Sequence, residues 1–176
     1  MARIFIGVKM SEKIESLAAR WAADKPDWPV RWIKPRNLHL TLAPPFYEAD
    51  LEKIMGKLAE VKPLKAPAAL RFREISYGPA GNYRLIWATG EPAPELEKIK
   101  AEIEQVLNLK ADRRNFLPHL TLARFKPEDY GKFKVKNLRE RIDWSERAEF
   151  FTLFESSLTP AGAEYKILKN FLLWKK

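Results

Sequence analysis

The stretch His-Leu-Thr-Leu-Ala at residues 39–43 is repeated letter for letter at residues 119–123. These two copies hold both histidines of the 176-residue chain. In a β-strand, successive side chains point to opposite faces. Each copy therefore predicts a strand with a leucine face that packs on helices and a polar face that looks into a cleft.

The polar faces carry His39 with Thr41 and His119 with Thr121, each pair about 7 Å apart along its strand. Histidine titrates near pH 6.5, so one neutral imidazole can take a proton while a second, charged one gives a proton. Threonine hydroxyls can donate to the non-bridging oxygens of a phosphate. This set favours metal-free phosphoryl chemistry, and we expect His119 to be the base and His39 the acid.

The rest of the chain alternates strand and helix patterns. Hydrophobic alternation predicts strands, and apolar spacings of three and four predict helices. Pro44-Pro45 is expected to end the first motif strand, because proline cannot donate to a ladder. Residues 126–147 are expected to be irregular, with a short helix near Leu138. We expect strands over 3–8, 30–33, 38–43, 68–77, 83–89 and 116–125, helices over 11–25, 50–61 and 94–107, and a hairpin of 148–159 with 163–174.

The order strand, helix, motif strand occurs twice in this pattern. It predicts an α+β fold with a bilobal, pseudo-twofold arrangement, in which two antiparallel β-sheets line a central cleft and the helices pack outside. No long linker interrupts the chain, so residues 1–176 are expected to form one bilobal domain.

Composition narrows the chemistry. The chain has no cysteine and only two histidines, which makes a poor set of metal ligands, and we expect neither a metal nor a cofactor. The net charge of +9 fits solubility alone as well as it fits a polyanionic partner, of which RNA or DNA comes first. No apolar run approaches ~20 residues, so we expect a cytoplasmic monomer with no membrane partner.

Further candidates lie beside the motifs. Arg124 follows the second copy and could bind a phosphate or stack on a base. Phe46 and Tyr47, just past the first copy, are the best candidates to stack on a base. A path for RNA could also be lined by the flanking basic residues Lys34, Arg36, Arg113, Arg114 and Lys126.

The two motifs and their surroundings resemble the 2H phosphoesterase superfamily, and most of all the RNA 2′,3′-cyclic phosphodiesterases, also called 2′-5′ RNA ligases. The resemblance implies a bilobal α+β fold with a basic, metal-free cleft centred on the two histidines and two threonines, with Arg124 as the arginine that ends the second motif. One departure follows the first motif, where Ala43-Pro44-Pro45-Phe46-Tyr47 replaces the usual basic residue and Phe-Leu-Gly. The stretches that carry the resemblance are 3–8, 32–42, 118–124 and 154–165.

The expected activity is hydrolysis of RNA 2′,3′-cyclic phosphate ends, such as those of tRNA fragments, to 2′-phosphates. The reverse reaction with a 5′-hydroxyl would be 2′-5′ RNA ligation. Two alternatives stay open: a related phosphodiesterase that acts on a small cyclic nucleotide, and a non-catalytic RNA-binding module.

Overall fold

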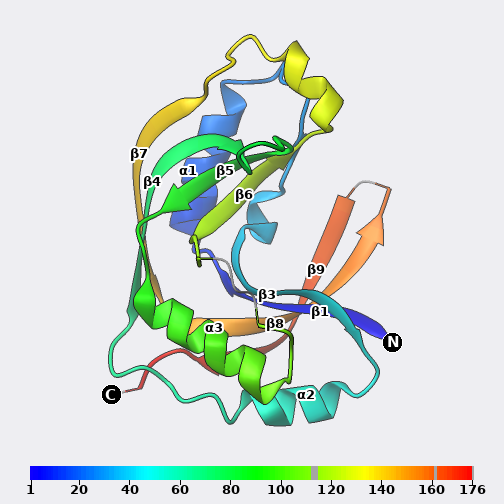
Figure 1. Ribbon diagram of the computed structural model, residues 1–176, viewed down its shortest axis with the longest axis vertical. Coiled ribbons are helices and arrows are strands. Elements are labelled where there is room, and N and C mark those ends of the chain that lie inside the picture. The colour runs from blue at the N-terminus through cyan, green and yellow to red at the C-terminus, as the bar shows by residue number, and fades with distance from the viewer. Residues whose placement is uncertain (112–114, 161, 176) are drawn as a thin grey trace.

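The strands of this computed structural model form one curled antiparallel sheet (Figure 1). The structure describes residues 1–111, 115–160 and 162–175. The strand order is β7-β4-β5-β6-β3-β1-β8-β9, with β2 paired to β6. The strands are β1 (Ala2–Lys9), β2 (Arg31–Trp32), β3 (His39–Glu48), β4 (Ala68–Gly78), β5 (Leu85–Gly90), β6 (His119–Arg124), β7 (Arg139–Ala148), β8 (Phe150–Thr159) and β9 (Gly162–Leu172).

Three α-helices of the described chain cover this sheet. Each buries one apolar stripe, as Leu96, Ile99 and Ile103 show in the third helix, where the spacing of three and four residues keeps side chains on one face. The first helix lies behind the upper half of the sheet and the other two lie below the lower half (Figure 1). The helices are α1 (Glu12–Ala23), α2 (Leu51–Leu58) and α3 (Pro94–Val106), and two short 3-10 helices are η1 (Pro35–Asn37) and η2 (Pro127–Lys132).

The prediction of two separate sheets is wrong, because the two motif strands pair with each other. β3 and β6 are antiparallel neighbours that join through the register pair Leu40 and Leu120. This seam merges β7-β4-β5-β6 on one side with β3-β1-β8-β9 on the other into one hydrogen-bonded sheet. The fold is therefore α+β with a curled, half-barrel antiparallel sheet.

The predicted repeat of strand, helix and motif strand is confirmed. β1, α1 and β3 follow in this order, interrupted only by the short β2 and η1, and β5, α3 and β6 repeat it. In each case the motif strand pairs with the strand before its helix, β3 with β1 and β6 with β5. The two motif strands consequently lie at the centre of the sheet.

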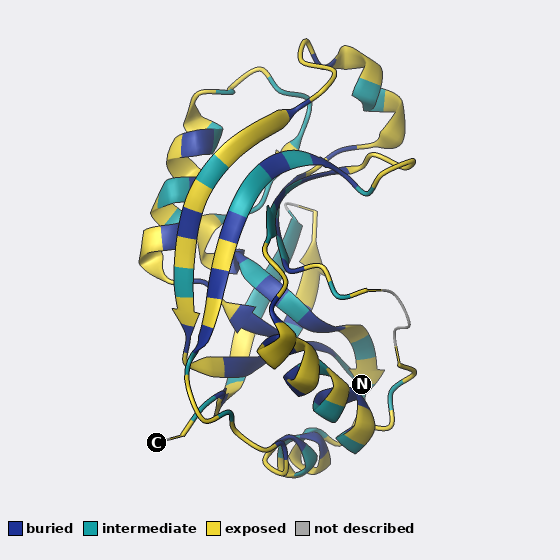
Figure 2. Ribbon diagram, turned by 60° about the vertical axis from the view of Figure 1, so that its left-hand side comes forward, coloured by how far each residue is buried: buried dark blue, intermediate teal, exposed yellow. Residues whose placement is uncertain are grey.

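The leucine face of both motif strands is buried, as the alternation predicts. Leu40, Leu42, Leu120 and Leu122 are at most 4% exposed and belong to the hydrophobic core. Exposed residues cover the outer sides of the helices (Figure 2). Burial of the leucines leaves the opposite, polar face of the motif strands for chemistry.

The first motif strand does not end at Pro44-Pro45, which corrects the sequence-based prediction. β3 continues to Glu48 along β1. Ile4 pairs with Phe46 and Ile6 with Ala43, so the ladder shifts register across the two prolines. Such a bulge needs no ladder donor at these positions, and proline is tolerated there.

Residues 126–147 are also more ordered than predicted. They contain η2 and most of β7, and Leu138 is a buried residue just before that strand rather than part of a helix. β7 is an edge strand, and charged residues are typical of edges because they oppose pairing with other chains. The sequence of this strand, Arg-Glu-Arg-Ile-Asp-Trp-Ser-Glu-Arg-Ala, is rich in charged residues, and it is therefore not predicted as a strand.

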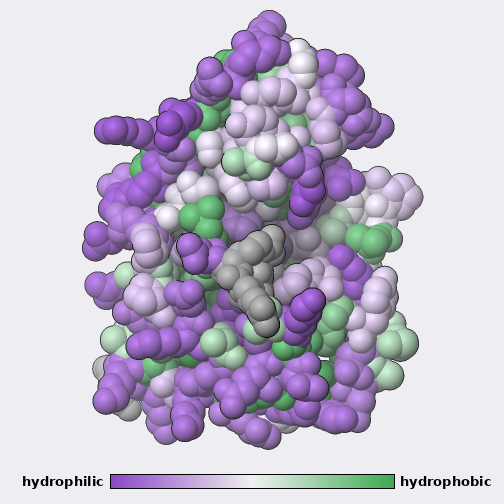
Figure 3. Space-filling model, in the orientation of Figure 1, coloured by the Kyte–Doolittle hydropathy of each residue, from purple (hydrophilic) through white to green (hydrophobic). Residues whose placement is uncertain are grey.

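Hydrophilic side chains cover most of the face shown in Figure 3. Within the described part of the chain, no helix is long and apolar enough to cross a membrane.

Candidate active site

The polar faces of β3 and β6 meet at the seam of the sheet. His39, Thr41, His119 and Thr121 are all partly exposed, whereas the leucines between them are buried. The strands run antiparallel with Leu40 opposite Leu120. One residue to either side of this pair, His39 therefore lies opposite Thr121, and Thr41 lies opposite His119. Each histidine thus has the other motif's threonine as its neighbour across the seam.

Both imidazoles are held in the same way. His39 Nδ1 lies 2.7 Å from the carbonyl oxygen of Asn37, and His119 Nδ1 lies 2.9 Å from the carbonyl oxygen of Leu117. A carbonyl only accepts, so each Nδ1 must carry the hydrogen. In the neutral ring Nε2 is then the free acceptor, and protonation makes it a donor. Both histidines are therefore preset to exchange protons through Nε2.

His39 is enclosed by aromatic rings. Its ring centroid lies 4.7 Å from that of Phe5 and 5.2 Å from that of Tyr165. The pKa of His39 is lowered to about 4, mainly by burial. The hydrogen bond to the Asn37 carbonyl opposes this shift, and the charges of Arg124 and His119 add to it. His39 is consequently neutral at pH 7 in the substrate-free protein.

His119 has a more open environment, with its ring 5.0 Å from that of Trp87. Burial is also the largest cause that lowers the pKa of His119, followed by the opposing hydrogen bond to Leu117 and the charge of Arg124. The shift is smaller than the one at His39. The two histidines therefore share a geometry and differ in how strongly they resist protonation.

Arginines gather beside the histidines. Arg124 ends β6, and its pKa is lowered by loss of part of its water and by the charges of Arg31, Arg84 and Arg3, while Tyr165 opposes this shift. Arg3 donates to the hydroxyl of Ser156 at 2.6 Å. Four like charges this close favour a bound anion, which would relieve their mutual repulsion.

A cavity of about 390 Å³, here called the histidine cavity, opens between β3 and the β8–β9 hairpin. It brings together His39, Thr41 and Arg124, as the sequence predicts. His119 and Thr121 lie next to it across the seam and are not part of its walls. The other polar or aromatic walls are Arg3, Phe5, Arg31, Thr159 and Tyr165.

Phe46 and Tyr47 do not line the histidine cavity. Phe46 packs partly against the core, and Tyr47 is 61% exposed beyond the bulge, in register with Arg3. Pro45 takes a place in the cavity wall instead. The two predicted stacking residues therefore lie outside the walls of the histidine cavity.

The flanking basic residues divide into three groups. Lys34 and Arg36 both pair with Glu164 of β9, so they hold the hairpin rather than line an open path. Lys126 lies exposed just after β6. Arg113 and Arg114 lie outside the residues that the structure describes.

Sequence reasoning missed Arg3, Arg31 and Tyr165 as members of the site. In β1 the core residues Ile4 and Ile6 alternate with Arg3 and Phe5, and this alternation is the signal that could have placed Arg3 on the polar face. Arg31 and Tyr165 come to the site through pairing of distant strands, which the sequence does not display.

The described residues contain no group of three or more histidine, cysteine, aspartate or glutamate side chains placed to hold a metal ion. The side chains available at the site are imidazoles, hydroxyls and guanidinium groups. They can transfer protons and hold an oxyanion.

Comparison with known proteins agrees with this geometry. Two relatives named RNA 2′,3′-cyclic phosphodiesterase align over nearly their full length. The one from Methanocaldococcus jannaschii is 28% identical over 96% of this chain and 99% of its own. The one from Aquifex aeolicus is 26% identical over 98% of each chain.

Solved structures share the fold. A protein of Thermus thermophilus superposes with a TM-score of 0.77 at 24% identity, covering 99% of this chain and all of its own. E. coli LigT gives a TM-score of 0.78 at 21% identity over 99% of this chain and 98% of its own. LigT has also been solved in complex with 3′-AMP, with a TM-score of 0.78 at 23% identity over 99% of both chains.

The family model described as the 2′-5′ RNA ligase superfamily matches residues 8–156. That range contains both motif strands and runs from the last two residues of β1 into β8, so β9 and most of β1 lie outside it. The chain therefore belongs to the 2′-5′ RNA ligase superfamily of 2H phosphoesterases.

Proposed function

We propose that this protein hydrolyses the 2′,3′-cyclic phosphate at the end of an RNA strand to a 2′-phosphate. The observation that carries the proposal is the matched pair of histidines, each fixed through Nδ1 and free at Nε2, on adjacent strands. The names of the aligned relatives support the same substrate class. Arginines around the histidine cavity provide the positive charge that a phosphodiester requires.

The reaction needs two proton transfers. A water oxygen attacks phosphorus and loses a proton to the neutral histidine, the bond from phosphorus to the 3′-oxygen breaks, and the charged histidine protonates that oxygen. Thr41, Thr121 and Arg124 donate to the non-bridging oxygens, which carry the negative charge of the transition state. With a 5′-hydroxyl as the attacking group in place of water, the same steps form a 2′-5′ linkage and leave a free 3′-hydroxyl.

The division of labour depends on which histidine takes up the proton. His39 resists protonation more strongly than His119 in the substrate-free protein. A bound phosphate anion favours the charged form of a histidine beside it. For His39 to be the acid and His119 the base, the anion must raise the pKa of His39 above that of His119.

A change of leaving group tests this assignment. If the 3′-oxygen of the cyclic phosphate is replaced by sulfur, the leaving thiolate needs no acid. We expect His39→Ala to lose much less activity on the sulfur substrate than on the oxygen substrate, and His119→Ala to lose the same on both. The opposite pattern would exchange the two roles.

The proposed activity is tested with the wild-type protein, EDTA present throughout, on mononucleoside and oligonucleotide 2′,3′-cyclic phosphates. Phosphorus NMR should show conversion to the 2′-phosphate, and His39→Ala should reduce the rate by at least 100-fold. Binding of RNA without turnover would support the non-catalytic alternative, and loss of activity in EDTA would contradict the metal-free mechanism.

A further inference from the structure

A second hollow of about 580 Å³, here called the side groove, adjoins the histidine cavity. It lies between the segment before β2 and the segment that runs from the end of β6 through η2. Arg31 and Arg124 line both hollows. The two arginines therefore stand at the boundary between the histidines and the side groove.

This pair of arginines is held together by the sheet. Arg31 of β2 and Arg124 of β6 are register partners. Like charges directly opposite each other in a ladder destabilise it. Among the described residues no side chain forms an ion pair or hydrogen bond with either guanidinium group. An anion between them would offset this repulsion.

Beyond the arginines the groove combines aromatic and basic walls. Trp28 and Phe125 both line it, and each packs edge-on against Phe133, at 5.4 and 4.9 Å between ring centroids. Lys126 and Lys132 provide positive charge, of which Lys132 is paired with Asp129 at 2.7 Å. Aromatic surface next to basic side chains is the chemistry that binds single-stranded nucleic acid.

We propose that the side groove binds the nucleotide that precedes the cyclic-phosphate end of a single-stranded RNA. The phosphate that links the last two nucleotides lies between Arg31 and Arg124, and Arg124 donates both to it and to the cyclic phosphate. The preceding nucleotide lies against Trp28 and Phe125 with Lys126 beside it. The inference rests on the proposed function and narrows its substrate to strands of two or more nucleotides.

The test compares two substrates that differ only in the preceding chain: a mononucleoside 2′,3′-cyclic phosphate and a trinucleotide that ends in the same group. The wild-type protein is expected to show a kcat/KM about 10-fold higher for the trinucleotide, because only this substrate reaches the side groove.

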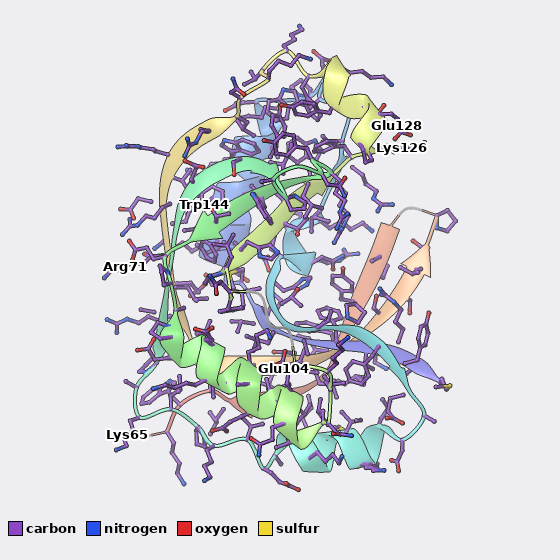
Figure 4. The ribbon with its side chains drawn as sticks, viewed as in Figure 1. Lys65, Arg71, Glu104, Lys126, Glu128 and Trp144 are labelled. Carbon is purple, nitrogen blue, oxygen red and sulfur yellow. The ribbon has the colours of Figure 1, made fainter. Side chains whose placement is uncertain are left out.

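Lys126→Glu reverses a charge in the groove, and Lys65→Glu is the matched control. Both lysines are exposed, and Figure 4 shows them at opposite ends of the molecule. Lys126→Glu is expected to lower kcat/KM for the trinucleotide about 10-fold and to change the mononucleotide less than twofold, while Lys65→Glu changes neither. Lys126→Ala should reduce the slope of log(kcat/KM) against log salt for the trinucleotide by about 0.7, the value for one phosphate contact on a single strand.

Two results for Lys126→Glu would overturn the inference. Equal losses of kcat/KM on both substrates would mean that the groove holds the terminal nucleotide itself, and no loss on either substrate would mean that the groove binds neither. If the wild-type protein hydrolyses neither substrate, the proposed function fails. Binding in the groove is then measured by fluorescence anisotropy with a labelled trinucleotide that ends in a 2′-phosphate. The affinity of the protein for this trinucleotide must fall in Lys126→Glu and stay unchanged in Lys65→Glu.

Discussion

His39 and His119 are held by equivalent hydrogen bonds yet sit in unequal surroundings. The rings of Phe5, Phe154 and Tyr165 lie within 6.0 Å of the ring of His39, between centroids, whereas Trp87 is the neighbour of His119. Aromatic enclosure removes water from His39, and this is the main reason why its pKa falls. The same enclosure makes protein stability depend on the protonation of this residue.

We expect the free energy of unfolding to fall as the pH is lowered from 6.5 to about 4. The pKa of His39 is about 4 in the folded protein and 6.5 when exposed, so the unfolded chain binds the extra proton in this window. The contribution is complete above pH 6.5, and about 3 kcal/mol of it is lost by pH 4. Urea unfolding of wild type and His39→Gln across this range measures it, because other groups titrate alike in both. Parallel curves for the two proteins would contradict the burial argument.

At the scale of elements, the motif strands depend on close approach of their neighbours. A Cβ atom on Gly7 of β1 would lie 2.6 Å from the carbonyl oxygen of Leu40 and 3.4 Å from the ring of His39. The first contact is with backbone and cannot be relieved by rotating a side chain. Glycine at this position therefore lets β1 pack against β3 where the histidine sits.

Gly7→Ala is expected to destabilise the protein by about 2 kcal/mol or more, as strain in a packed core does. Gly56→Ala is the control, because Gly56 lies on the exposed face of α2 and the added Cβ would meet no atom within 4 Å beyond the adjacent residues and the nearby helix backbone. Alanine favours a helix over glycine, so this variant should gain up to about 1 kcal/mol. Thermal and urea unfolding measure both, and a Gly7→Ala protein as stable as wild type would refute the close-approach argument.

The β8–β9 hairpin is tied to η1 beside His39 by two kinds of contact. The buried Asn37 side chain donates to the carbonyl oxygen of Ala163 at 2.8 Å, while the main-chain carbonyl oxygen of Asn37 accepts from His39. Glu164 accepts from Lys34 and Arg36 at the surface. The buried contact is expected to dominate, because exposed ion pairs contribute little and buried unpaired polar groups cost more.

Asn37→Ala should therefore cost about 1–3 kcal/mol of unfolding free energy, and Glu164→Gln less than about 1 kcal/mol. Urea unfolding at pH 7 compares them. A larger loss for Glu164→Gln would mean that the surface pairs, and not Asn37, fasten the hairpin.

Much of the secondary structure, and which face of each element is buried, could be predicted from periodicity alone. The alternation in the motif strands correctly separated buried leucines from the polar residues, and the stripe of Leu96, Ile99 and Ile103 correctly predicted α3. The errors fall where tertiary context decides. A bulge lets β3 pass through Pro44-Pro45, and the open edge of the sheet explains the charges of β7.

At the scale of the whole molecule, the sequence could show that two similar halves exist but not how they join. Nothing in the repeated pentapeptides indicates that Leu40 pairs with Leu120, because register between distant strands is set by the assembled fold. That single pairing brings His39 and His119 onto one continuous surface. Other pairings complete the site: β2 with β6 brings in Arg31, and β9 with β8 brings in Tyr165.

If the two halves supply one acid and one base to a single reaction, the histidines must act as a unit. Removing either one should then cost nearly as much as removing both. We expect His39→Ala and His119→Ala each to reduce the single-turnover rate of hydrolysis of an RNA cyclic phosphate by 100-fold or more. The rate of the double variant should be less than 10-fold below that of the slower single variant. Circular dichroism and thermal unfolding of all three variants check that the fold is intact. If the rate reductions of the two single variants multiply in the double variant, each histidine acts independently. The pairing of β3 with β6 would then bring the two histidines together without making them act in one reaction.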